Sequence, residues 1–231
     1  MTYKKVLLKN GILEAYHDLD MEDFYGHPKR KVILEPKIKK WNKQNPEDKI
    51  NLDFTQGEQI YKEVKLYIDN LSKALKHGIS LILWGPNGSG KTLLGTSILK
   101  VGIRQGYSVQ MTSLGGIIEA YTEGWYNPDK KEIFNRKIKD VDFLLIDDVG
   151  KEYKAKNNEL VEVAFDNLVR YRSFRHKPFI LTTNTSINKL QTVYGKSLYS
   201  LLAGKGIDIE VVGKDYRKLI QKKGLKQLLL E

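Results

Sequence analysis

The sequence predicts an α/β fold in which helices flank a mainly parallel, doubly wound sheet of five strands. Two observations lead to this class. Short apolar runs alternate with helical patterns along most of the chain, and the turn after the first of these runs is rich in glycine. The expected strands are 81–84, 107–111, 141–146, 178–182 and 210–212, and the expected helices between them are 91–104, 114–124, 158–175 and 186–202.

The chain before the first strand has two parts. Residues 1–57 mix charges, aromatic residues and isolated prolines, so we expect an extension that packs partly on the core and is partly linker. From Gln59 to His77 the apolar residues follow helical spacing, and Gly78 is a suitable C-cap. We therefore expect an extension over 1–57 and one domain over 58–231, which ends in a helix near 216–229.

The glycine-rich turn fits the phosphate-binding pattern G-x-x-x-x-G-K-[ST] at every fixed position. In a strand–loop–helix context, backbone N–H groups converge on phosphate oxygens and the helix N-terminus adds its positive end. Lys91 would reach the β- and γ-phosphates, and the Thr92 hydroxyl would ligate Mg²⁺. A glycine turn with a chance lysine is the alternative. The predicted nucleotide contacts are Gly85, Pro86, Asn87, Gly88, Ser89, Gly90, Lys91, Thr92 and Leu93.

Polar residues follow two later strands. Asp147 and Asp148 end the apolar run 141–146, and Asn184 follows the run 178–182. In P-loop ATPases, an Asp at such a strand tip holds Mg²⁺, so Asp147 is the metal candidate and Asp148 the candidate base. Asn184 could orient the attacking water. The alternatives are that the two carboxylates cap a strand and that the amide forms a turn.

Composition restricts the remaining possibilities. The 231 residues include no cysteine, which excludes disulfides and thiolate chemistry. No apolar stretch is long enough to cross a bilayer, so we expect a cytoplasmic protein with no membrane partner. The charge of +11, from 39 Lys and Arg against 28 Asp and Glu, fits either a polyanionic partner or an ordinary basic surface. Basic residues gather in 29–49 and 214–226.

The order of these motifs resembles a known family. The segments Trp84–Thr92, Leu144–Gly150, Pro178–Asn184 and Lys214–Lys218 are similar to the AAA+ ATPases of the DnaC/DnaI helicase-loader group, whose close relatives are the IstB transposition helpers. The resemblance covers about 58–220 and implies a RecA-like αβα sandwich without a large lid domain. It also implies Arg217 as a sensor that reaches the γ-phosphate.

The same resemblance implies a function. A phage-type member of this group would hydrolyse ATP with Mg²⁺, assemble as a homo-oligomer or on its partner, and load a DnaB-type replicative helicase onto single-stranded DNA. An IstB-like transposition regulator that binds duplex DNA is one alternative. A nucleotide-gated adaptor with little turnover is another.

Two departures from the family pattern favour the adaptor alternative. The family often has Glu where this chain has Asp148, which is one methylene shorter. The segment 195–201 lacks both arginines that the family places there, one of which acts on the neighbouring subunit's nucleotide. Lys196 or Lys205 could substitute, but a lysine lacks the planar fork of arginine.

The region before the third strand contains candidate DNA contacts. Tyr121 and Trp125 lie close in sequence to Lys130 and Lys131, a combination that suits base stacking and phosphate contact. Packing of the two aromatic residues in the core or a loop explains the same pattern. The four histidines show no metal-ligand spacing, so no zinc site is expected.

Overall fold

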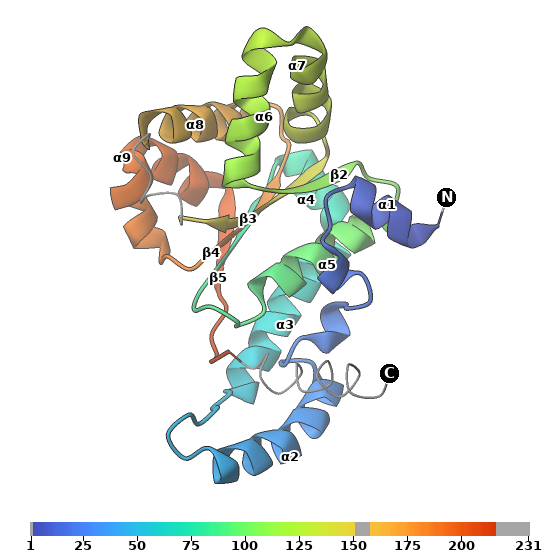
Figure 1. Cartoon of the computed structure of the whole chain (residues 1–231), viewed down its shortest axis with the longest axis vertical. Helices are drawn as coiled ribbons and strands as arrows, with labels where there is room; N and C mark the ends of the chain where they lie inside the picture. The colour runs from blue at the N-terminus through green and yellow to red at the C-terminus, as the bar shows by residue number, and fades with distance from the viewer. Residues whose placement is uncertain (1, 151–157, 216–231) are drawn as a thin grey trace, which may run out of the picture.

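The computed structural model of the chain describes residues 2–150 and 158–215. Its centre is a five-stranded sheet in the order β2-β3-β4-β1-β5, in which every pair of neighbours is parallel (Figure 1). The strands are β1 (Ser80–Trp84), β2 (Val109–Ser113), β3 (Phe143–Val149), β4 (Phe179–Thr183) and β5 (Gly206–Glu210). The parallel sheet confirms the predicted α/β class.

Side chains that alternate along the strands belong to two separate apolar clusters, one on each face of the sheet. One cluster packs the sheet against α3 (Phe54–Asp69), α4 (Leu71–His77) and α5 (Lys91–Arg104). The other packs the opposite face against α6 (Leu114–Tyr126), α8 (Asn158–Phe174) and α9 (Ile187–Lys205). In β1, for example, Leu81 and Leu83 belong to the first cluster and Ile82 to the second. Helices on both faces make the αβα sandwich that was predicted.

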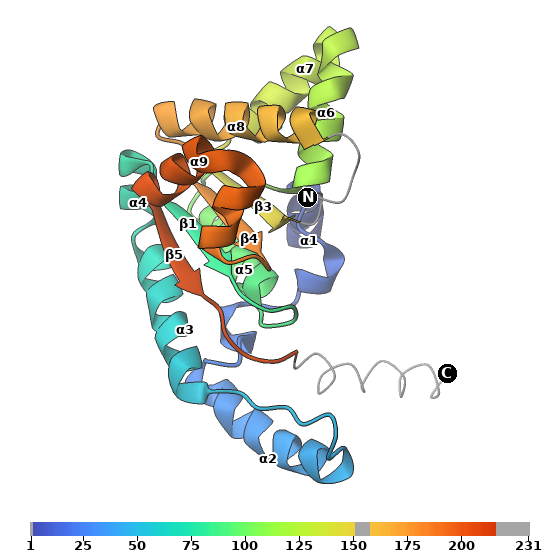
Figure 2. The same cartoon turned by 90° about the vertical axis from the view of Figure 1, so that its left-hand side faces the viewer.

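The region between α6 and β3 is helical. After α6 come α7 (Pro128–Phe134) and a π-helical turn, η3 (Asn135–Lys139). The helices α6 and α7 pack so closely that a β-carbon on Gly124 would lie 3.2 Å from Cα of Lys131. Together they form a helical hairpin that projects beyond the sheet in both views (Figures 1 and 2).

Several element bounds differ from those predicted. The helix expected over 59–77 is two helices, which meet at Asn70, and Gly78 caps the second with φ +67°. The last strand is 206–210 rather than 210–212. Because β5 is an edge strand, Ile209 is its one fully buried side chain, and the apolar signal is correspondingly weak. The helix expected at 216–229 lies outside the described residues.

The N-terminal segment is built into the core. It contains α1 (Tyr3–Lys9), the 3-10 turns η1 (Glu14–Tyr16) and η2 (Met21–Asp23), and α2 (Pro28–Gln44). Its buried apolar side chains belong to the same cluster as α5 and are Leu7, Ile12, Phe24, Tyr25, Leu34, Ile50 and Leu52. The buried ammonium of Lys100 donates to the carbonyls of Tyr16, His17 and Leu19 and fastens the segment to α5.

Within the described residues, no helix is long and apolar enough to cross a bilayer. The same residues contain no cluster of three or more His, Asp or Glu side chains that could hold a metal ion by themselves.

Candidate nucleotide-binding site

The loop between β1 and α5 has a backbone that requires glycine. Gly85, Gly88 and Gly90 have φ values of +145°, +75° and +103°, which L-residues rarely adopt. A β-carbon on Gly85 would lie 2.3 Å from the carbonyl oxygen of Val211, and one on Gly88 would lie 2.3 Å from Cγ of Asp215. The glycines therefore serve two purposes, since they permit the turn and make room for the segment that follows β5.

This loop ends at the N-terminus of α5, and its polar groups fit an anion. Gly90 is the N-cap and provides no side-chain bond to the first turn, so the helix leaves N–H groups facing the loop. Among the described residues, the buried hydroxyl of Ser89 finds no hydrogen-bond partner. Lys91 is almost fully buried, and its Nζ donates to the carbonyls of Gly85 (2.8 Å) and Pro86 (2.7 Å). A phosphate group would satisfy this set of donors.

Asp147 lies beside the start of α5, within hydrogen-bond distance of Thr92. The Thr92 and Thr182 hydroxyls both donate to Oδ1 of Asp147, at 2.9 Å and 2.6 Å. Burial raises the pKa of this carboxyl group, and the two hydrogen bonds oppose the rise. Adjacent ligands of an octahedral Mg²⁺ ion stand about 3 Å apart, because each lies about 2.1 Å from the metal. The Thr92 and Asp147 oxygens therefore fit two neighbouring positions around Mg²⁺.

Asp148 has an unusual backbone that the sequence does not reveal. Its φ is +62°, and the pairing of β3 with β4 shifts register between Ile146 and Val149. The backbone N–H of Asp148 donates to Thr182 Oγ1 (2.8 Å), and Asn184 Nδ2 donates to Asp148 Oδ1 (3.0 Å). The bulge therefore brings Asp148 and Asn184 together at the carboxyl edge of the sheet, next to the loop.

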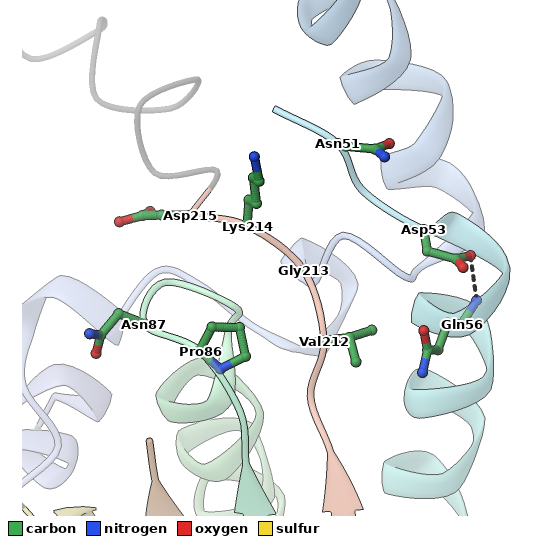
Figure 3. Close-up of a pocket in the computed structure, with 9 residues that line it drawn as sticks. All are labelled: Asn51, Asp53, Gln56, Pro86, Asn87, Val212, Gly213, Lys214 and Asp215. Atoms are coloured by element: carbon green, nitrogen blue, oxygen red, sulfur yellow. Dashed lines mark hydrogen bonds between the residues drawn. The ribbon is translucent and has the colours of Figure 1, made fainter. Parts of the chain in front are cut away.

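A pocket of about 610 Å³ opens beside the loop (Figure 3). Its walls come from three parts of the chain that are distant in sequence: the start of α3, the glycine loop and the segment after β5. The lining residues are Asn51, Asp53, Gln56, Pro86, Asn87, Val212, Gly213, Lys214 and Asp215. Tyr25 supports this wall, because its hydroxyl donates to the carbonyl of Val212 at 2.7 Å.

The structure thus brings together the predicted residues Gly85 to Leu93, Asp147, Asp148 and Asn184. Arg217 lies outside the described residues, and so do the side chains of Lys196 and Lys205. The candidate DNA residues lie elsewhere, on the hairpin of α6 and α7. There the Tyr121 ring stacks edge-on with Phe134 at 5.8 Å, whereas Trp125 is 53% exposed and Lys130 pairs with Glu123.

Sequence reasoning missed several residues at this site. Thr182 lies inside a predicted strand, and only its position two residues before Asn184 relates it to the site. The pocket residues Asn51, Asp53 and Gln56 belong to a segment in which no motif is visible. Asp53 caps α3 by accepting from Gln56 N at 3.0 Å, a local capping signal that could have marked the helix start.

The family model of the IstB-like ATP-binding proteins matches residues 29–206. The chain belongs to this family. The match runs from the first turn of α2 to the start of β5, so it includes the glycine loop, both carboxylates and Asn184. The resemblance inferred from the motifs is thereby confirmed, and the chain has an AAA+ ATP-binding fold.

Curated relatives include replication initiators. The chain is 29% identical to the chromosomal replication initiator protein DnaA of Onion yellows phytoplasma over 147 residues, which are 62% of this chain and 28% of that protein. It is 27% identical to DnaA of Acholeplasma laidlawii over 97 residues, 42% of this chain and 21% of that protein. The chain thus spans less than a third of the length of these relatives.

Solved structures show the same core. A replication initiator DnaA bound to AMPPCP and single-stranded DNA is 27% identical, with a TM-score of 0.55 over 74% of this chain and 51% of that chain. The DnaC helicase loader has a TM-score of 0.66 over 87% of this chain and 100% of that chain at 15% identity. DnaI has a TM-score of 0.54 over 74% and 88% at 19% identity. At such identities DnaC and DnaI establish the fold alone.

Proposed function

We propose that this protein is an ATP-dependent helicase loader that binds ATP, Mg²⁺ and single-stranded DNA. The observation that carries the proposal is the contact between Thr92 and Asp147, which joins the phosphate loop to the carboxyl edge of the sheet. Family membership supports ATP as the nucleotide. The similarity to a DnaA structure with AMPPCP and single-stranded DNA supports a DNA-linked role.

Each part of the site has a distinct role in this proposal. The loop from Gly85 to Leu93 holds the phosphates, and Lys91 leaves its carbonyl partners to contact the β- and γ-phosphates. Thr92 and Asp147 hold Mg²⁺, which when bound neutralises charge on the phosphates. Asp148 accepts a proton from the attacking water, and Asn184 keeps that carboxylate oriented. Arg217 is the proposed sensor of the γ-phosphate.

The pocket beside the loop is the proposed site of the adenine base. It is large enough for a base, and Pro86 offers it an apolar surface. Asn51 and Asp53 supply hydrogen-bond acceptors that match the exocyclic amino group of adenine. Guanine has a carbonyl oxygen at that position, which an aspartate carboxylate would repel. Preference for ATP over GTP therefore depends on Asp53.

The proposed partner is a DnaB-type replicative helicase, with a homo-oligomer or an assembly on the helicase as the working state. The folds of DnaC and DnaI support this partner. Single-stranded DNA would stack on Trp125, which is exposed on the hairpin, with Lys130 and Lys131 near its phosphates. Tyr121 would buttress this surface, because its ring packs against Trp125 at 5.6 Å.

One observation favours a second function. The segment 195–201 has no arginine, so a neighbouring subunit would lack the finger that accelerates hydrolysis by orders of magnitude. A nucleotide-gated adaptor, whose partner supplies that arginine, fits this sequence. The family also includes transposition helpers, and preference for duplex over single-stranded DNA would indicate that role.

Steady-state ATP turnover tests the proposal, measured alone, with single-stranded DNA and with duplex DNA of the same length. A loader shows turnover that single-stranded DNA raises several-fold. Lys91→Ala and Asp148→Asn abolish that turnover, and Lys76→Ala, on the exposed side of α4, leaves it unchanged. Tight ATP binding without turnover in any condition establishes the adaptor instead. Stimulation by duplex DNA alone contradicts the loader.

A further inference from the structure

The helix α2 carries a concentration of positive charge that the nucleotide site does not use. The 17 residues of α2 include six lysines and Arg30 but only one carboxylate, that of Glu35. Leu34, Ile38 and Trp41 recur at positions i, i+4 and i+7 and hold one stripe of the helix on the core. The rest of the helix is mainly exposed, and it lies at the end of the molecule opposite the hairpin in both views (Figures 1 and 2).

The two halves of α2 differ in how their charges are balanced. In the first half, Lys29 pairs with Glu22, Arg30 with Asp23 and Lys31 with Glu35. The second half carries four exposed lysines, and within the described parts of the chain none of them forms an ion pair or a side-chain hydrogen bond. They are Lys37, Lys39, Lys40 and Lys43.

Helix stability does not account for this cluster. A cation in the last turn of a helix is favourable, and Lys43 lies there. Lys37 and Lys40 are three residues apart, and Lys39 and Lys43 are four apart, so each pair is neighbouring on the helix surface and repels. Each such pair costs about 0.2–0.5 kcal/mol, so the cluster does not stabilise the helix, and an anion lying across it would relieve the repulsion.

The turn after α2 carries charges of both signs, because the exposed Glu47 and Asp48 precede Lys49. The turn after the helix is held by reciprocal hydrogen bonds between Asn42 and the backbone of Ile50, at 2.9 Å and 2.8 Å. Lys49 lies in this turn and is exposed. The exposed Lys214, which also lines the pocket beside the loop, reaches the carbonyl of Lys49 at 3.4 Å. Lys214 thus connects this turn to the rim of the proposed nucleotide pocket.

We propose that the second half of α2 binds the phosphodiester backbone of DNA, at a surface separate from the hairpin of α6 and α7. Lysines act as point charges toward phosphates, and successive phosphates along a strand can face a helix whose cations recur every turn. Protein interfaces are instead depleted in lysine and enriched in aromatic residues, methionine and arginine. From residue 36 to residue 44, the exposed face of α2 offers none of these three.

Fluorescence anisotropy with labelled single-stranded and duplex DNA, titrated from about 50 to 200 mM salt, tests this surface. The test variant replaces Lys37, Lys39, Lys40 and Lys43 with Gln, which is a good helix former. The matched control replaces the exposed Lys5, Lys9, Lys73 and Lys76 with Gln and so removes the same charge. A third variant, Lys130→Gln with Lys131→Gln, removes the hairpin cations.

The α2 variant should bind DNA at least 10-fold more weakly, and its slope of log affinity against log salt should fall by about 3, since each phosphate contact contributes about 0.7–0.9. The control should change the slope by less than about 1. ATP affinity should stay equal in all four proteins, so the result is independent of the nucleotide site. Comparing the loss of affinity for single-stranded DNA with the loss for duplex DNA shows which form the surface prefers.

An α2 variant that matches the control in affinity and slope overturns the proposal. So does an α2 variant that binds DNA normally but no longer binds the helicase, because the cluster then contacts an acidic protein surface. Failure of ATP turnover in the wild-type chain would contradict the proposed enzyme but leave this DNA measurement intact.

Discussion

Thr182 is the side chain whose removal should disturb the candidate site most selectively. It is buried at 1% exposure, donates to Asp147 at 2.6 Å and accepts from the backbone N–H of Asp148 at 2.8 Å. One hydroxyl therefore orients both carboxylates. Thr182→Val keeps the shape of the side chain and removes only this hydroxyl.

The expected loss of folding stability in Thr182→Val follows from the two hydrogen bonds that the hydroxyl makes. Loss of a hydrogen bond to a charged group costs about 1.5–3 kcal/mol, and a buried N–H left without an acceptor costs about 1–3 kcal/mol. Because both bonds share one hydroxyl, the effects are not additive, and we expect a stability loss of about 2–4 kcal/mol. Groups that orient metal ligands typically affect metal affinity or activity by about 10–100-fold, which sets the expected loss of turnover.

Urea denaturation and Mg²⁺ titration of ATP turnover separate the two effects. Thr183→Val is the matched control, since Thr183 is equally buried but donates to the carbonyl of Val149 and not to a carboxylate. Both variants should lose stability, and only Thr182→Val should need more Mg²⁺ for half-maximal turnover. If the two variants share the same Mg²⁺ dependence, Thr182 is structural and the reasoning about Asp147 is wrong.

Three further predictions concern the scaffold around the site. Arg172 is fully buried and donates to the carbonyls of Ile138, Lys139, Val141, Asp142 and Pro178, so Arg172→Met should cost about 3–5 kcal/mol in urea denaturation. The variant Arg170→Met, which breaks a half-exposed pair with Asp166, should cost much less stability than Arg172→Met, and equal losses would refute the assignment. Burial raises the pKa of Asp142, but the hydrogen bonds from Lys177 and Ser108 outweigh this effect and hold the pKa below 3.8. The ionised carboxylate therefore stabilises the fold at pH values above about 3.8. Asp142→Asn should therefore cost about 1–2 kcal/mol at pH 7, a difference that shrinks as the pH falls below about 3.8, and a constant difference would contradict this. Gly88→Ala should weaken ATP binding at least 10-fold, because its β-carbon would meet Asp215. Gly106 also has a positive φ, but no described atom lies within 4 Å of the position of its β-carbon, so Gly106→Ala should bind ATP normally in the same titration.

The elements that carry the phosphate loop were predictable because their signals are local. The helix over 91–104 has the predicted bounds, since a glycine N-cap precedes it and a buried apolar stripe runs along it. Asp147, Asp148 and Asn184 come together because parallel strands end at one edge of a sheet.

Other features depended on tertiary context. The isolated prolines of the N-terminal segment gave no helical signal, yet α2 begins at Pro28, a position that suits proline. It continues through Pro36 because Leu34, Ile38 and Trp41 anchor it to the core. The bulge at Asp148 arises from pairing with β4. Aspartate tolerates a positive φ, but the sequence does not indicate that Asp148 adopts one. The wall formed by Asn51 and Asp53 depends on packing between segments more than 150 residues apart, which a single sequence does not reveal.

Binding of a fluorescent ATP analogue, with and without Mg²⁺, tests the central claim most directly. The account predicts that Mg²⁺ strengthens binding to the wild-type chain, that Lys91→Ala weakens binding at least 10-fold, and that Asp147→Asn removes the Mg²⁺ effect. Lys76→Ala, an exposed lysine on α4, should bind like the wild type. Equal affinity of the wild type and Lys91→Ala, or the same Mg²⁺ effect in Asp147→Asn, would contradict the account.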